Sequence, residues 1–109
     1  MFAAIGRFLR GLFTTNAKPE VERSSQWPKY RAEHLKIEPI CQWCHGRDVL
    51  EVHHVVPVHI APSRELDRTN YITLCEEPSR ECHLKQGHKG NWKDYDLKIR
   101  KKCRDKWAK

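Results

Sequence analysis

The chain has 109 residues, a formal net charge of +7 and a pI of about 9.3. This length excludes a large multidomain enzyme, and the small core that it allows makes a metal brace a natural supplement to apolar burial. The excess of Lys and Arg favours a polyanionic partner, with nucleic acid as the first candidate and a merely basic surface as the alternative.

Residues 1–24 are predicted to form an amphipathic helix followed by a linker. In the first 13 residues the apolar side chains fall on one side of a helix, and Arg7 and Arg10 lie elsewhere. This segment is too short to cross a bilayer and has no convincing cleavage site. We expect it to pack on its own domain or on a partner rather than on a membrane. Residues 14–24 are mostly polar, with Val21 as their only sizeable apolar residue, which indicates a linker.

Ordered elements are predicted to begin near Ser25. Ser25 is the candidate cap of a first helix, Pro28 suits its first turn, and Pro39 ends it. The β-branched run at residues 49–56 is typical of a strand. A second short ordered segment covers residues 70–74 and leads to a cysteine.

Two further helices are predicted toward the C-terminus. A short helix from Cys82 carries His83 and His88, and Gly87 and Gly90 limit its length. Residues 97–107 form a closing basic helix. Together these elements predict one α+β domain over residues 25–109.

Four cysteines in two pairs predict a structural zinc site. The odd total of five cysteines and the tight spacing of the first pair favour thiolate ligation in a reducing compartment over disulfides. Cys103 is then the spare thiol. Because six residues separate the second pair, His83 or His45 could replace one of its sulfurs. The predicted ligands are Cys41, Cys44, Cys75 and Cys82.

Adjacent histidines at positions 53 and 54 predict two separate roles. Neighbouring side chains on a strand point to opposite faces, so His53 and His54 do not bind one ion in the same manner unless the strand ends or bends there. A following helix can bring His83 to the same metal as His53, with His54 beside it to take a proton from water.

At these residues the chain resembles the HNH endonuclease family, whose fold is the ββα-metal finger. The resemblance covers about residues 23–95. It is carried by Cys41-Gln-Trp-Cys44, Val52-His53-His54-Val55-Val56-Pro57, Asn70-Tyr-Ile-Thr-Leu-Cys75 and Cys82-His83. The segment Gly87-His88-Lys-Gly-Asn91-Trp92 is similar to a feature of a phage and bacterial, zinc-braced branch of that family.

The resemblance implies roles for individual residues. His54 is similar to the general base that activates water, and Asn70 to the residue that supports the finger and orients the base. His53 and His83 are similar to the ligands of a catalytic divalent ion, Mg²⁺, Mn²⁺ or Ni²⁺, that is separate from the structural Zn²⁺. His88 competes with His83 as a ligand or joins it, because five residues are a poor same-face spacing on an ideal helix; it could also contact phosphate.

DNA is the expected substrate. The candidate phosphate contacts are Lys29, Arg31, Lys36 and Lys89. Trp27 and Trp92 are expected to pack in the core. No segment resembles a base-reading helix, so we expect limited sequence specificity.

These observations predict a metal-dependent HNH endonuclease that hydrolyses DNA phosphodiester bonds, by nicking or by double-strand cleavage. The alternative is a catalytically inactive zinc-braced module that binds nucleic acid. A third class is an interaction or membrane-surface protein built around residues 1–13. We expect a location in the cytoplasm of a bacterial host, no small-molecule cofactor, and a protein partner from phage packaging or of another kind.

Overall fold

Two strands, β1 (Leu50–His54) and β2 (Tyr71–Cys75), pair in antiparallel fashion at the centre of the structure, a computed structural model that describes residues 16–108. The register pairs Leu50 with Cys75 and His54 with Tyr71. Strand β1 is shorter than the predicted run 49–56, because Val49 has a positive φ of 51° and the chain turns away after His54. Every residue of β2 is buried.

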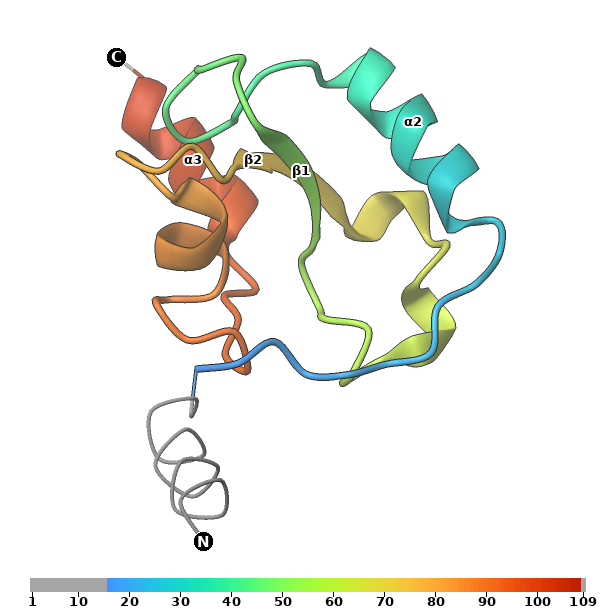
Figure 1. Ribbon diagram of the computed structural model, residues 1–109. Helices are drawn as coiled ribbons and strands as arrows, with labels where there is room; N and C mark the ends of the chain where they lie inside the picture. Colours follow the sequence, from blue (N-terminus) through green and yellow to red (C-terminus); the bar gives the residue numbers. More distant parts are fainter. Residues whose placement is uncertain (1–15, 109) are drawn as a thin grey trace, which may run out of the picture.

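Helix α2 (Trp27–Ile37) lies on one side of this sheet (Figure 1). Pro28 occupies its first turn and the helix ends before Pro39, as predicted. The predicted cap at Ser25 is wrong. Gln26 is the N-cap residue, and its side chain makes no capping bond. The Ser24 hydroxyl accepts a hydrogen bond from the Gln26 N–H (3.1 Å).

The other side of the sheet is covered by η3 (His83–Gly87) and by helix α3 (Ile99–Trp107), which confirms the predicted α+β class (Figure 1). The core gathers there and is rich in sulfur. It consists of Cys41, Ile72, Leu74, Cys75, Cys82, Ile99 and Cys103. Two short 3-10 turns, η1 (Pro62–Arg64) and η2 (Arg68–Asn70), shape the loop between the strands.

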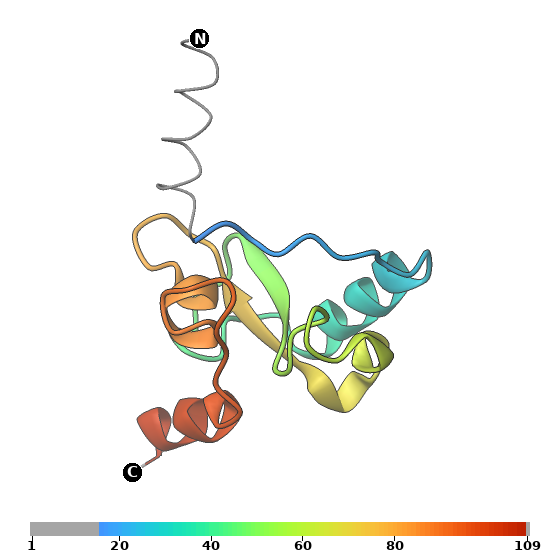
Figure 2. The same cartoon turned by 90° about the horizontal axis from the view of Figure 1, so that it is seen from below.

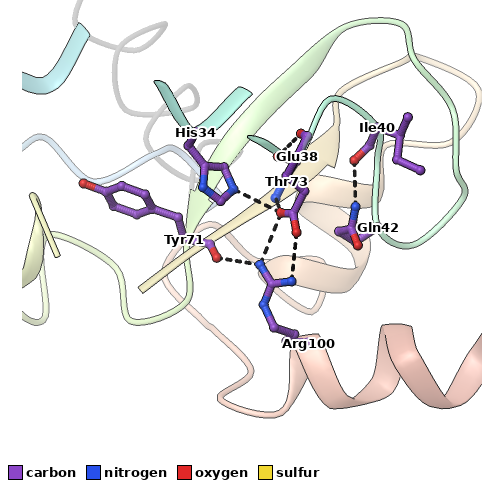
Figure 3. Close-up of polar contacts among 7 residues, drawn as sticks. All are labelled: His34, Glu38, Ile40, Gln42, Tyr71, Thr73 and Arg100. Atoms are coloured by element: carbon purple, nitrogen blue, oxygen red, sulfur yellow. Dashed lines mark hydrogen bonds and ion pairs between the residues drawn. The ribbon is translucent and has the colours of Figure 1, made fainter. Parts of the chain in front are cut away.

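Glu38, just after α2, joins the two helices to the sheet (Figure 3). Its carboxylate accepts hydrogen bonds from His34 Nε2 (3.0 Å), the Thr73 N–H (2.7 Å) and Arg100 Nη1 (2.9 Å). Arg100 also donates to the Tyr71 carbonyl (2.8 Å). Burial opposes ionisation of this carboxyl, but the three donors outweigh burial and lower the pKa of Glu38 to about 2.

Residues 16–24, called the strap below, run extended from the loop after η3 to the start of α2 (Figures 1 and 2). Asn16 bonds the Trp92 N–H (2.8 Å) and the Gly90 carbonyl (3.1 Å). At the other end the Ser24 N–H donates to the Glu65 carboxylate (3.0 Å). The predicted linker therefore lies against the domain, while the boundary at residue 24 stays a prediction.

The helix predicted over residues 1–13 lies outside the described residues. Among residues 16–108, no helix has the length and apolar character needed to span a bilayer.

Candidate active site and metal centres

Four cysteine sulfurs meet beside the sheet, within 4.8 Å of one another. Cys41 and Cys44 lie on the turn between α2 and β1, Cys75 ends β2, and Cys82 precedes η3. The Cys44 and Cys75 sulfurs are 3.8 Å apart. Two thiolates on one tetrahedral zinc ion, each at about 2.3 Å, are also separated by about 3.8 Å. The four thiols therefore fit a structural metal ion.

No histidine is needed to complete this cluster. His45 stacks on Trp107 with ring centroids 3.8 Å apart, and His83 belongs to a second cluster. Cys103 is buried in the core and is the spare thiol, as predicted. Burial raises the pKa of Cys41 and Cys82. It opposes ionisation of Cys75 as well, but N–H groups of Cys82 and Glu77 outweigh burial and lower the pKa of Cys75 to about 7.

His53, His83 and His88 form the second cluster, the histidine triad, in which one nitrogen of each ring lies within 4.8 Å of the others. His53 Nδ1 is 3.1 Å from His83 Nε2. Two imidazole nitrogens on one zinc-like ion, each at about 2.0–2.1 Å, are separated by about 3.3 Å. His88 Nδ1–H donates to the Asp94 carbonyl (2.8 Å), which leaves its Nε2 as the ligand nitrogen.

The local backbone brings His83 and His88 together. On an ideal α-helix, side chains five residues apart differ by about 140° in direction. Here η3 is a single turn of π-helix, in which the His88 N–H donates to the His83 carbonyl (3.1 Å). The wider turn places both rings beside His53, with ring centroids 5.0 and 4.6 Å from it.

The second nitrogens of His53 and His83 are not part of the pair that would hold an ion. His53 Nε2 and His83 Nδ1 are buried without a hydrogen-bond partner among the described residues. The Glu76 carboxylate is 3.6 Å from His83 Nδ1, within ion-pair range. Burial, followed by the neighbouring His83 charge, lowers the pKa of His53 well below its ordinary value and that of His88 to about 4. The rings of His53 and His88 are therefore neutral near pH 7, the form that binds a metal ion.

His54 points to the opposite face of β1, as the strand period predicts. It is buried, and its ring lies 4.5 Å from Trp27 and 5.2 Å from Tyr71. Its Nε2–H donates to the Glu65 carbonyl (2.9 Å), which leaves Nδ1 as the unprotonated nitrogen. Burial is the largest cause that lowers the pKa of His54, so the ring is a neutral base near pH 7.

Asn70 closes the loop between the two strands. Its side chain accepts from the Val56 N–H and donates to the Val56 carbonyl, both at 2.9 Å. The same loop carries Glu65, whose carbonyl also accepts from the Tyr71 hydroxyl (2.6 Å). Asn70 thus lies where it supports the loop that holds His54.

The histidine triad and His54 line one cleft of about 240 Å³. Of the four predicted phosphate contacts only Arg31 lines this cleft, and it pairs with Glu51 (2.9 Å). Lys29, Lys36 and Lys89 are exposed outside it. Sequence reasoning missed other residues that line the cleft, for which charge is the only sequence signal; they are Lys18, Arg23, His59 and Glu76.

A family model described as HNH endonuclease matches residues 41–89, from the first cysteine of the metal cluster to the residue after His88. These residues form an HNH endonuclease domain. The resemblance and the ββα-metal fold expected from it are thereby confirmed, and the domain indicates a nuclease or a related role on nucleic acid. Neither the curated proteins nor the solved structures compared with the chain give a match. The strap, α2 and α3 lie outside the matched segment of the HNH domain.

Proposed function

We propose that this protein is a metal-dependent endonuclease that hydrolyses DNA phosphodiester bonds with His54 as the general base. The observation that carries the proposal is the arrangement of β1. Two adjacent residues of this strand present a metal-ligand cluster and a neutral, oriented imidazole to one cleft. Such a pair can position an ion on a phosphate and deprotonate the attacking water.

The described residues divide the chemical work. His54 Nδ1 takes the proton of the attacking water, while Glu65 and Trp27 hold the ring in place. His53, His83 and His88 would hold the divalent ion. When bound, that ion supplies positive charge that neutralises the scissile phosphate and stabilises the departing oxygen. Asn70 keeps the loop of Glu65 closed, so it is a positioning residue.

The cofactors follow from the donor atoms. Four thiolates suit a structural Zn²⁺, and three imidazoles leave coordination positions open on a divalent ion. Of the candidates Mg²⁺, Mn²⁺ and Ni²⁺, imidazole ligands suit Ni²⁺ best. Thiolate ligands persist under reducing conditions, so we place the protein in the cytoplasm of a bacterial host. The positive charge of the chain supports binding to DNA with limited sequence preference.

A plasmid-nicking assay with zinc-loaded protein and added Mg²⁺, Mn²⁺ or Ni²⁺ tests the proposal. We expect conversion of supercoiled to open-circular or linear DNA by the wild type and loss of conversion in His54→Gln. Protein that binds DNA but nicks with none of the ions would instead be the inactive nucleic-acid-binding module. Nicking by His54→Gln at the wild-type rate would remove His54 from the mechanism.

A further inference from the structure

The strap forms one side of the cleft. Lys18, Pro19, Val21 and Arg23 line the same cavity as the histidine triad and His54. Both ends of the strap are held by hydrogen bonds to distant segments, through Asn16 at Trp92 and through Ser24 at Glu65. Figure 2 shows its path from the loop after η3 to α2. An element tied at both ends is part of the wall of a site rather than a loose connection.

Arg23 lies at the end of the cleft that holds the general base. Its Nε–H donates to the nearly buried Glu65 carboxylate (2.7 Å), and its guanidinium lies 4.9 Å from the centroid of Trp27, the ring that packs on His54. A guanidinium carries five N–H donors, and among the described residues Glu65 uses only this one. The other donors can bind a phosphate while Glu65 holds the side chain in position.

Lys18 lies at the end that holds the histidine triad. Its ammonium is 3.6 Å from the Glu76 carboxylate and 4.4 Å from the centroid of Trp92. The Trp92 ring in turn lies 5.1 Å from His83 and 5.0 Å from His88. Lys18 lines the cleft, and its side chain is 60% exposed, so its ammonium can contact a bound phosphate.

We propose that the strap is a wall of the substrate-binding cleft and that Lys18 and Arg23 bind backbone phosphates of the nucleic acid on the two sides of the reacting phosphodiester. This inference rests on the proposed function, because it assumes that nucleic acid occupies the cleft. Phosphate contacts of this kind set the register of the strand and carry no sequence information, in keeping with limited specificity.

The test measures binding of a labelled DNA duplex of about 20 base pairs at several salt concentrations, using the zinc-loaded full chain with His54→Gln to prevent cleavage. Lys18→Gln and Arg23→Gln are compared with two matched controls outside the cleft. Arg64→Gln removes an arginine that is also paired through Nε with a carboxylate (3.0 Å) and equally exposed, 41% against 39%. Lys101→Gln removes a paired lysine that is 64% exposed.

We expect each strap variant to weaken binding about 5-fold and to lower the slope of log K against log salt by about 0.9, the value for one phosphate contact. The controls should leave that slope unchanged. Unchanged or tighter binding by both strap variants would overturn the proposal, and tighter binding would identify the strap as an obstruction of the cleft.

Two checks keep this test independent of folding and of catalysis. Zinc content and thermal melting show whether Arg23→Gln, which leaves Glu65 without its partner, still folds; Arg23→Lys keeps the charge and should keep the salt slope. If Arg23→Gln is unfolded, the binding of Lys18→Gln and its salt dependence alone decide whether the proposal holds. Wild-type protein that never nicks DNA would refute the proposed function. It would not refute phosphate binding by the strap, because the binding measurement does not depend on cleavage.

Discussion

His53 and His54 are identical side chains whose surroundings separate their chemistry. The strand period sends His53 to the face of η3, where two more imidazoles meet it, and His54 to the face of α2, where Trp27 and the Glu65 carbonyl hold it. Both rings are buried and both have a lowered pKa. A neutral ring serves as a ligand in one place and as a proton acceptor in the other.

The pH dependence of cleavage should report on His54. Because the pKa of His54 is lowered from 6.5, the ring is already an unprotonated base at pH 6.5. We therefore expect the cleavage rate to be nearly flat above pH 7 and to fall only as the pH drops below 6.5. His54→Gln, which keeps a donor for Glu65, should cleave about 10²–10⁴-fold more slowly without loss of zinc. Single-turnover rates from pH 5 to 9 check both; a rate that still rises steeply above pH 7 would contradict the base assignment.

Glu76 should orient the His83 ring. Its carboxylate lies 3.6 Å from His83 Nδ1, the nitrogen that has no hydrogen-bond partner among the described residues. We expect Glu76→Gln to reduce the affinity of the triad for Ni²⁺ by about 10–100-fold. Calorimetric titration of zinc-loaded protein measures this affinity. The neighbouring Glu77→Gln, whose partners are Ser79 and Arg80, is the control and should bind Ni²⁺ as the wild type does.

At the scale of elements, the π-helical turn η3 converts an unfavourable spacing into a metal site. Its close packing on the sheet depends on Gly87. A Cβ at this position would meet the Leu74 side chain at 2.9 Å and the His53 ring at 3.2 Å. The absence of a side chain therefore lets the turn approach β1 and β2 closely enough for His83 and His88 to meet His53.

Gly87→Ala should damage both stability and metal binding. Crowding of a packed contact costs about 1–3 kcal/mol, and the displaced His53 ring should weaken Ni²⁺ binding. Urea unfolding and Ni²⁺ titration measure the two effects. Gly90→Ala is the control, because its Cβ meets nothing within 4 Å although its φ of 84° is unfavourable for alanine. We expect it to lose stability but to keep the wild-type Ni²⁺ affinity.

The hydrogen bonds of the Glu38 carboxylate should make the free energy of unfolding depend on pH. The folded pKa of about 2 lies below the ordinary value of 4.5, so the carboxylate stabilises the folded state at pH values above 4.5. This stabilisation, up to about 3 kcal/mol, is lost as the pH falls from 4.5 toward 2. The difference in unfolding free energy between wild type and Glu38→Gln should therefore shrink between pH 5 and pH 2. Glu33→Gln, which removes an exposed ion pair with Arg68, should show little difference at any pH.

At the scale of the whole molecule, the four-cysteine cluster compensates for a small core. Four of the seven residues in the core cluster are cysteines, and three of these are metal-cluster thiols. The cluster joins the turn before β1, the end of β2 and the start of η3. Without an ion the buried thiols contribute little more than small apolar side chains, so folding should depend on the metal.

Removal of zinc should unfold the domain, whereas loss of the second ion should not. Cys41→Ser, or chelation at neutral pH, is expected to abolish cooperative unfolding followed by circular dichroism, because structural zinc sites supply about 10–16 kcal/mol in small fingers. His83→Ala should retain one zinc per chain and a cooperative transition, yet lose nicking. Metal analysis by mass spectrometry checks the stoichiometry. A folded, metal-free Cys41→Ser protein would contradict the prediction that folding requires the structural zinc ion.

Residue identity and spacing predicted the four-cysteine cluster and the meeting of His53 with His83, because ligand chemistry restricts which side chains can meet and the strand period separates His53 from His54. They left open whether His88 joins the triad. Local rules also predicted the sites of the strands and helices, with ends that differ by a few residues. The cap of α2 was predicted wrongly, because the helix begins at Trp27 and its N-cap residue is therefore Gln26 rather than Ser25.

Only the tertiary structure decided the π-helical turn, the hydrogen bonds of Glu38 and the path of the strap. Each depends on partners far away in sequence. The turn η3 packs through Gly87 on Leu74 and His53. Glu38 accepts a hydrogen bond from Arg100, 62 residues away, and Asn16 accepts one from Trp92, 76 residues away. Such contacts form once the chain has collapsed, so no local pattern encodes them. They determine which polar residues come to line the cleft.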